Sequence, residues 1–395
     1  MSFDFRGKAD AAELTALLAD LVKINSVNPF TGELGKDGDG EAGMISYISA
    51  FFDREGIEYE LQEGLPQRCN LVAHIKGRGC GSLVFEAHTD TVSVDAMVIP
   101  PFEPVIKDGL MYGRGSCDCK GSVAAMMYAF AMIKRSGVVP PCDLYFVAAA
   151  DEEYAYRGVL RFLEDGKRYD GAVVGEPTSM EICIANKGVT RFFIEARGVA
   201  CHSSMPAKGH SAITDMAKLI LKIETEFKPK FSEYVHPLIG ARALSVTKLS
   251  GGELVNIIPD RCRAEVDVRT LAGDTFEGIK AQLEALIAEL KAEDPSVDIV
   301  VEPAYLEDQC METPEDAAVV QAMCSAADKV TGSHSIAGLL TGCDATKFSR
   351  AGTPALVFGP GDMGKAHTID EYIDLAQLPA AAEVYAQICA DFKDQ

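Results

Sequence analysis

Hydrophobic residues recur at helical spacing in two segments near the start of the chain. In the first, Asp10 and Glu13 form a capping-box pattern just before the apolar positions Leu14, Leu17, Leu18, Leu21 and Val22. In the second, residues 41–55 repeat the spacing, and Gly56 is well placed to end it. The pattern therefore predicts two amphipathic helices at the start of the fold.

Short apolar runs then alternate with helical patterns. We expect strands at residues 70–75, 82–87, 144–150 and 172–174, and helices at residues 122–134 and 159–164. Alternation of this kind is typical of an α/β fold with a mixed, largely parallel sheet flanked by helices.

The pattern changes between residues 187 and 300, where alternating strands (190–196, 261–269) accompany helices (212–226, 275–291). The α/β pattern then resumes with a strand near Val300, a helix at 314–330, a strand at 355–358 and a helix at 378–392. We therefore predict a main domain in two parts, 1–186 and 301–395, interrupted by an inserted α+β domain at 187–300.

Composition narrows the functional classes. The chain has 395 residues, 48% of them hydrophobic, and a net charge of −22, which disfavours binding to nucleic acid or to anionic membranes. No apolar run is long enough to span a bilayer, and residues 1–8 are polar and lack an apolar secretion signal, so we expect a cytoplasmic protein. The twelve cysteines show no paired spacing and are expected to be buried thiols, the C-x-C of Cys117 and Cys119 included.

Candidate chemistry lies where the predicted strands end. His88 follows an apolar run, and Asp90 could accept the second ring N–H of a histidine that binds metal. Asp118 lies in a Gly-rich turn directly before a helix, where a carboxylate could bridge two metals. Taken alone, these residues could equally be an ordinary strand end and an ordinary helix cap.

Further carboxylates follow the same pattern. Glu152 and Glu153 follow a very apolar strand. Two adjacent glutamates can divide the work, with one as a metal ligand and the other as a general base. Glu176 closes another short strand, and His367 follows the last one. Two histidines and three carboxylates at strand ends predict a hydrolytic pair of Zn²⁺ ions about 3.5–4 Å apart.

Eight motifs in order extend this prediction over essentially the whole chain. HTD, YGRGSCDCKG, DEE, GEPT, CHSSMPAKG, VNIIPD, DVR and FGPGDMGKAHTIDEY stand as they do in one known family. The chain resembles the zinc amidohydrolases and metallopeptidases that include acetylornithine deacetylase, succinyl-diaminopimelate desuccinylase, aminoacylase and glutamate carboxypeptidase. The resemblance implies that the insertion is a lid that mediates dimerisation, so a homodimer is expected.

The resemblance also implies residue roles. The two zinc ions, for which cobalt can substitute, would be held by His88 and Glu176 on one side, Glu153 and His367 on the other, and Asp118 between them. Asp90 would orient His88, Glu152 would be the general base, and His202 would reach the partner subunit's site to stabilise the oxyanion. Asn256 and Arg269 match lid positions that hold polar groups of the substrate. Cys119 departs from the family pattern, in which many relatives carry Met or Asp.

The predicted reaction is hydrolysis of an N-acyl amino acid or a short peptide by metal-activated water. A dipeptidase or carboxypeptidase using the same site is the alternative, and a non-catalytic binding protein is a more distant one. The remaining histidines lack a matched constellation and are expected to be structural or on the surface: His74, His210, His236 and His334. No nucleotide-binding glycine motif is present.

Overall fold

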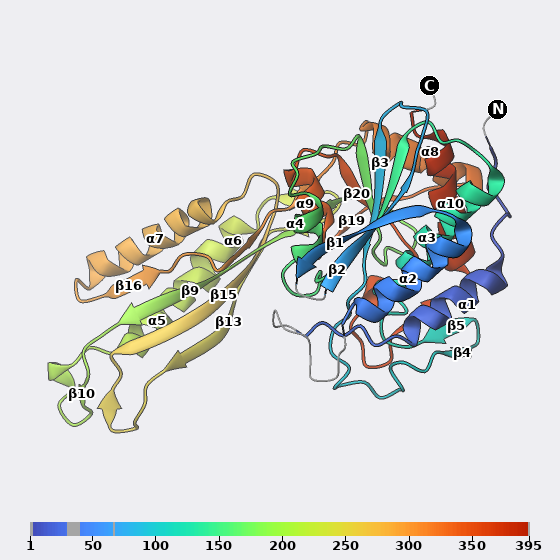
Figure 1. The fold of residues 1–395 in the computed structure, drawn as a ribbon. Helices are drawn as coiled ribbons and strands as arrows, with labels where there is room; N and C mark the ends of the chain where they lie inside the picture. The colour runs from blue at the N-terminus through green and yellow to red at the C-terminus, as the bar shows by residue number, and fades with distance from the viewer. Residues whose placement is uncertain (1–2, 30–39, 66–67, 394–395) are drawn as a thin grey trace. The chain divides into compact units, whose positions relative to one another are not determined.

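The computed structural model describes residues 3–29, 40–65 and 68–393. The first two residues of the polar start, Met1 and Ser2, lie outside these ranges. The chain forms two compact units, coloured along its length in Figure 1. The first comprises Met1–Ala185, Glu312–Leu339 and Cys343–Gln395, and the second comprises Asn186–Met311 and Leu340–Gly342.

A nine-stranded mixed sheet forms the centre of the first unit. Its strands are β1 (Glu58–Leu65), β2 (Arg68–Ile75), β3 (Ser82–His88), β6 (Asp143–Ala149), β7 (Gly171–Val174), β8 (Ile182–Asn186), β18 (Met311–Glu312), β19 (Ile336–Leu339) and β20 (Ala355–Val357). The order is β1-β2-β6-β3-β7-β20-β8-β18, with β19 paired to β8. Strands β6, β3, β7 and β20 are parallel, whereas β1, β2 and β8 pair antiparallel. The predicted fold class is therefore confirmed, with the parallel part confined to the centre.

Helices surround this sheet. They are α1 (Ala11–Val22), α2 (Ala42–Glu55), α3 (Lys120–Ser136), α4 (Arg157–Phe162), α8 (Ala318–Thr331), α9 (Ala345–Arg350) and α10 (Gln377–Asp391). Helix α3 is buried from Lys120 to Ile133 because it packs against β3 and between α1, α2 and α10. A small sheet of β4 (Val105–Lys107), β5 (Leu110–Tyr112) and β21 (Tyr372–Asp374) and the 3₁₀ turn η3 (Met363–Lys365) complete the unit.

The predicted capping box is only half formed. The Asp10 carboxylate accepts hydrogen bonds from the backbone N–H groups of Ala12 and Glu13, as an N-cap should. The Glu13 carboxylate does not return to the Asp10 N–H; it accepts from Arg135 and Tyr128 instead. A charged hydrogen bond to a guanidinium is stronger than one to a neutral amide, so this tertiary contact replaces the local one.

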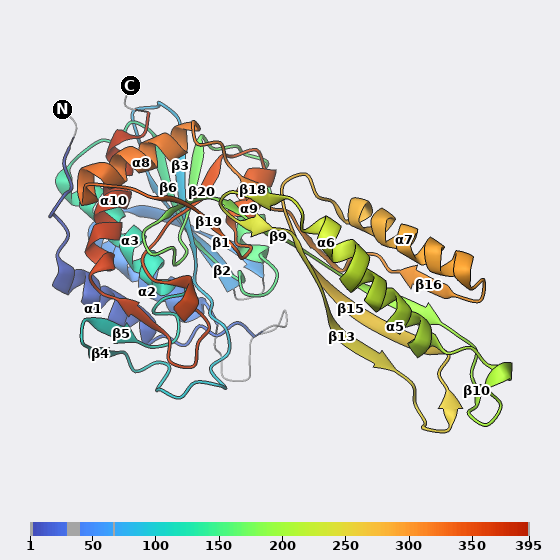
Figure 2. The same ribbon diagram turned by 180° about the vertical axis from the view of Figure 1, so that it is seen from behind.

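The second unit is an antiparallel sheet with helices α5 (Ala212–Lys222) and α7 (Phe276–Glu293) packed on it (Figure 2). Its strands run in the order β13 (Ala243–Gly251), β15 (Arg261–Thr270), β9 (Gly188–Arg197) and β16 (Asp298–Val301), with β17 (Leu306–Asp308) also on β9. Helix α5 continues through a π-helical turn, η2 (Ile223–Phe227), into α6 (Lys228–Phe231). Shorter pieces are β10 (Cys201–His202), η1 (Pro206–Lys208), β11 (Val235–His236), β12 (Gly240–Ala241) and β14 (Ile257–Ile258). Within the described ranges, no helix is both long and apolar enough to cross a membrane.

Candidate metal centre

All the candidate site residues of the first unit except Asp118 end or follow a central parallel strand. His88 ends β3, Glu152 and Glu153 follow β6, and Glu176 follows β7. His367 lies in the segment after β20, and Asp118 lies just before α3. Because parallel strands end at the same edge of a sheet, side chains far apart in the sequence meet there.

Asp118 lies between the two histidines. Its Oδ1 is 3.0 Å from His88 Nε2, and its Oδ2 is 3.1 Å from His367 Nε2. His88 Nε2 is also 3.9 Å from Glu176 Oε1, and His367 Nε2 is 3.0 Å from Glu153 Oε1. One carboxylate therefore contacts both a His88–Glu176 group and a His367–Glu153 group, as a ligand shared by two metals would.

Burying this many carboxylates close together is unfavourable unless cations lie beside them. Burial raises the pKa of Glu176 and Glu153, and the nearby Asp118 charge adds to both effects. Burial would also raise the pKa of Asp118, but hydrogen bonds with His367 and His88 outweigh it and hold that pKa below its ordinary value. Within the described ranges, no lysine or arginine forms an ion pair with these three carboxylates.

Asp90 connects the histidine to the two glutamates. The Nδ1 of His88 is 2.9 Å from the main-chain oxygen of Asp90, and the nearer carboxylate oxygen of Asp90 is 3.6 Å away. That carboxylate accepts hydrogen bonds from the backbone N–H groups of Glu152 and Glu153, each at 3.1 Å, and from Asn28 at 2.7 Å. Asp90 therefore fixes the main chain that carries both glutamates, a role that the sequence did not suggest.

A buried ion-pair network holds Asp151, the residue directly before Glu152. Arg68, fully buried, donates to both carboxylate oxygens of Glu41 and to Asp151 at 3.0 Å. Arg157 donates to Asp151 as well, and Asn28 links Asp151 to Asp90. Asp151, directly before Glu152, is thus paired with two arginines, whereas Glu152 forms no ion pair with an arginine of the described residues. Sequence reasoning missed Glu41 and Arg68 because neither lies near a motif.

Glu371 holds the turn that presents Asp118. Its buried carboxylate accepts hydrogen bonds from the backbone N–H groups of Gly115, Cys117 and Asp118 at 3.1, 2.9 and 3.0 Å. Arg114 donates to the same carboxylate at 2.6 Å. A carboxylate that satisfies three main-chain donors fixes the turn in one conformation. The HTIDEY motif contained Glu371, but only the fold shows its partners.

Two buried carboxyl groups near His88, those of Glu86 and Asp344, form a pair that sequence reasoning also missed. Glu86 and Asp344 are 1% exposed each, and none of their four oxygens receives a hydrogen bond from a donor other than a carboxyl group. Burial raises the pKa of Glu86 and, opposed by Lys347 and His88, raises that of Asp344 to about 7. A proton held by Glu86 lets the pair hydrogen-bond to each other. The sequence did contain one signal for this pair, since Glu86 is an acidic residue inside the otherwise apolar strand predicted at 82–87.

The remaining predicted residues belong to the second unit. His202 lies in β10, where its Nδ1 is 2.7 Å from Ser204 Oγ, and the main-chain oxygen of Asn256 accepts from the Ser203 N–H at 2.9 Å. Arg269 lies on β15 and donates to Asp267 at 2.9 Å. His202 and Asn256 are therefore neighbours at the two-stranded sheet of β10 and β14, whereas Arg269 lies on the separate five-stranded sheet.

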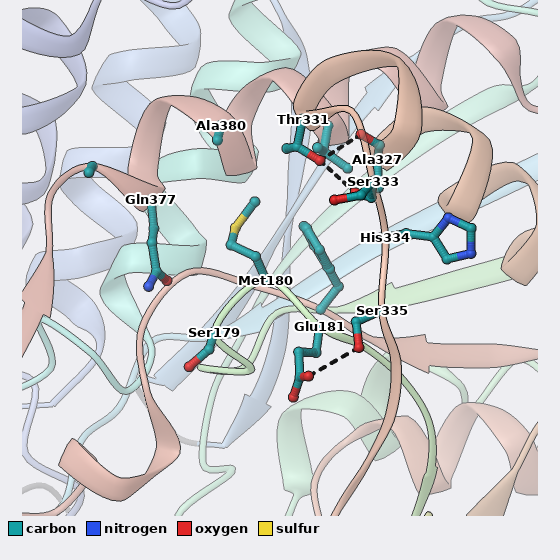
Figure 3. Close-up of a pocket in the computed structure, with 13 residues that line it drawn as sticks. Ser179, Met180, Glu181, Ala327, Thr331, Ser333, His334, Ser335, Gln377 and Ala380 are labelled. Carbon is teal, nitrogen blue, oxygen red and sulfur yellow. Dashed lines mark hydrogen bonds between the residues drawn. The ribbon is translucent and has the colours of Figure 1, made fainter.

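A cavity of about 370 Å³ in the first unit lies beside the segment that follows Glu176 (Figure 3). In this view Met180 lies at the centre with Ser179 and Glu181 below it, and Gln377 and His334 stand on opposite sides. Its lining includes none of the predicted metal ligands. The Glu181 carboxylate accepts a hydrogen bond from the Ser335 hydroxyl at 3.2 Å.

Known proteins are similar to this chain in sequence and in fold. Residues 84–391 match the model of "Peptidase family M20/M25/M40". The chain is 31% identical over 360 residues to an acetylornithine deacetylase of Myxococcus xanthus, covering 88% of this chain and 92% of that one. It is 27% identical over 403 residues to a probable succinyl-diaminopimelate desuccinylase of Staphylococcus epidermidis, covering 94% and 96%.

The Bacillus subtilis protein YXEP, described as a dinuclear metal-binding peptidase, has a TM-score of 0.73 at 17% identity over 96% of this chain and 97% of that one. Fold and sequence together define a metal-dependent amidohydrolase. The chain belongs to peptidase family M20/M25/M40.

The Glu86–Asp344 pair generates a prediction about stability. A buried carboxyl whose pKa is raised keeps its proton when the unfolded chain has lost it, so the folded state loses stability as pH rises from the ordinary value of 3.8 toward about 7. In Glu86→Gln the neutral amide can donate to Asp344 permanently. We expect the metal-free variant to lose less stability over this interval, as measured by denaturant unfolding at several pH values.

The exposed Glu103→Gln is the matched control, because it also removes one carboxyl and should follow the wild-type pH profile. Equal pH slopes for Glu86→Gln and the wild type would show that no proton is shared between Glu86 and Asp344.

Proposed function

We propose that the protein removes the acyl group from a small N-acyl amino acid, in the manner of an acetylornithine deacetylase or a succinyl-diaminopimelate desuccinylase. The observation that carries this proposal is Asp118, whose two oxygens contact a histidine on either side. Two divalent ions are proposed per chain, zinc by donor chemistry, with cobalt as a substitute.

The residues fit such a pair. His88, Glu176 and one oxygen of Asp118 would hold one ion, and His367, Glu153 and the other oxygen would hold the second. Imidazole nitrogens and carboxylate oxygens are the donors that zinc accepts, and among the described residues no lysine or arginine pairs with these buried acids. When bound, the ions would polarise the amide carbonyl and lower the pKa of water toward neutrality.

The other side chains have roles around this centre. Burial raises the pKa of Glu152, which suits a base that takes a proton from water and returns it to the leaving amine. Asp90 orients His88 and the backbone of Glu152. His202 of a partner subunit would stabilise charge on the carbonyl oxygen, and Asn256 and Arg269 would bind the polar end of the substrate.

A dipeptidase or carboxypeptidase is the second candidate, since the YXEP protein of the same fold is described as a peptidase. The two activities differ in the group beyond the cleaved amide, which pocket contacts decide. A non-catalytic binding protein is disfavoured, because it would have no need of Glu152 beside a full set of ligands.

The direct test is a panel of N-acetyl and N-succinyl amino acids and dipeptides, assayed with zinc-loaded or cobalt-loaded protein. We expect the highest kcat/KM on an acyl amino acid. Preference for dipeptides would support the peptidase instead, and no turnover of any substrate by metal-loaded protein would contradict both.

Neighbouring glutamates allow a matched comparison of roles. Glu152→Gln should retain two ions per chain and lose nearly all turnover, because only the proton carrier is removed. Glu153→Gln should also lose metal, because it removes a ligand. Metal counting together with kcat measures both effects. Near-normal turnover in Glu152→Gln would show that another residue carries the proton.

The proposed dimer can be tested by complementation. His202→Ala and Glu152→Gln should each be nearly inactive, since losing an oxyanion partner costs about 10²–10³ in rate. Mixed and allowed to exchange subunits, they should recover activity, because one site of each heterodimer has both residues. Verified heterodimers that stay inactive would place His202 in its own subunit's site or outside catalysis.

A further inference from the structure

A second group of metal-competent side chains lies within the second unit, which contains none of the five ligands proposed above. His210, Asp215 and Asp294 each offer one ligand atom, and these atoms lie within 4.8 Å of one another. His210 directly precedes Ser211, the N-cap of α5, Asp215 is in the first turn of that helix, and Asp294 directly follows α7. Two separate points of the unit, the start of α5 and the end of α7, therefore meet here.

The His210 ring is held on both sides. Its Nε2 contacts Asp215 Oδ2, and its Nδ1 is 3.2 Å from the hydroxyl of Ser296. Its main chain is fixed too, since the N–H and C=O of His210 pair with those of Val199. The hydroxyl of Ser296 donates to Asp294 at 2.5 Å. The ring is thus fixed beside both carboxylates.

Asp215 provides an observation that is independent of the spacing of the three ligand atoms. Its side chain is completely buried, yet Oδ1 has no hydrogen-bond partner. Lys218 Nζ is 3.5 Å from this oxygen and 3.8 Å from Asp294 Oδ2, so Oδ1 faces the space that Asp215 shares with Asp294. Because the lysine side chain is 43% exposed, it compensates the buried charge only weakly.

We infer that His210, Asp215 and Asp294 bind a divalent cation. One imidazole nitrogen and two carboxylate oxygens are typical zinc donors, and two carboxylates against one lysine leave a net negative charge that attracts a cation. The lysine ammonium would leave when the ion binds. His210 ends the segment that begins at His202, so the ion would tie that segment to both helices. This inference does not depend on the proposed function.

Counting ions tests the site. Asp294 is exposed enough to be changed without disturbing the core, and we expect Asp294→Asn to hold one zinc per chain fewer than the wild type at the same free zinc concentration. His210→Gln should do the same. Glu293→Gln is the matched control, because it removes an exposed charge one residue away and should keep the wild-type count.

This difference of one ion is expected whatever the first unit binds, so it is distinct from the outcome for the proposed catalytic pair. Equal zinc counts in the wild type, Asp294→Asn and His210→Gln would overturn the inference.

Lys218→Met provides a result that a purely structural cluster would not give. Removing the competing ammonium should tighten this one site, and zinc should then raise the unfolding temperature of Lys218→Met more than that of the wild type. Zinc should raise it less in Asp294→Asn. Identical zinc-dependent shifts in all three proteins would also overturn the inference.

Discussion

Repulsion among buried acids is the constraint on which the site depends. Glu153 and Glu176 meet at one edge of the sheet because the strands before them are parallel, and the turn before α3 brings Asp118 to the same place. The fold supplies these acids with two histidines but no lysine or arginine within the described ranges. Burial of an uncompensated carboxylate is expensive, so an arrangement of this kind is stable only with protons or metal ions in it. The same side chains that could bind cations are therefore those that the scaffold leaves unpaired.

The acidic residues that surround the site, in contrast, are paired with arginines or with main-chain N–H groups. Asp151 and Glu41 share the guanidinium of Arg68, and Glu371 is satisfied by Arg114 and by main-chain N–H groups. Such paired carboxylates are fixed in place and can orient what they touch. Asp90 belongs to this supporting group, since it binds Asn28 and the N–H groups of both glutamates. Pairing thus separates the acids that support the site from those that are available to it.

Local patterns predicted the fold class and the strand ends, because apolar runs and the residues that close them are contiguous in sequence. His88 and Glu176 could be proposed in this way. Partners distant along the chain could not: Glu371 is 253 residues from Asp118, and Arg68 is 83 from Asp151. Only the Asp10 half of the predicted capping box forms, for the same reason: Arg135, which binds Glu13 instead, is 122 residues away in the chain. Helix α8 begins at Ala318 and not near residue 314, because residues 314–317 form a separate turn in which the Ala317 N–H donates to the Pro314 carbonyl.

The position of β20 has a consequence for synthesis on the ribosome. This strand lies between β7 and β8, yet residues 175–354 separate it from β7 in the chain. Until Ala355–Val357 emerges, the edges of β7 and β8 that will face it have no partner, and the apolar residues Val173 and Val174 border an open slot. Unpaired strand edges invite misplaced pairing during folding. The second unit can complete its own core meanwhile, so the first unit closes last.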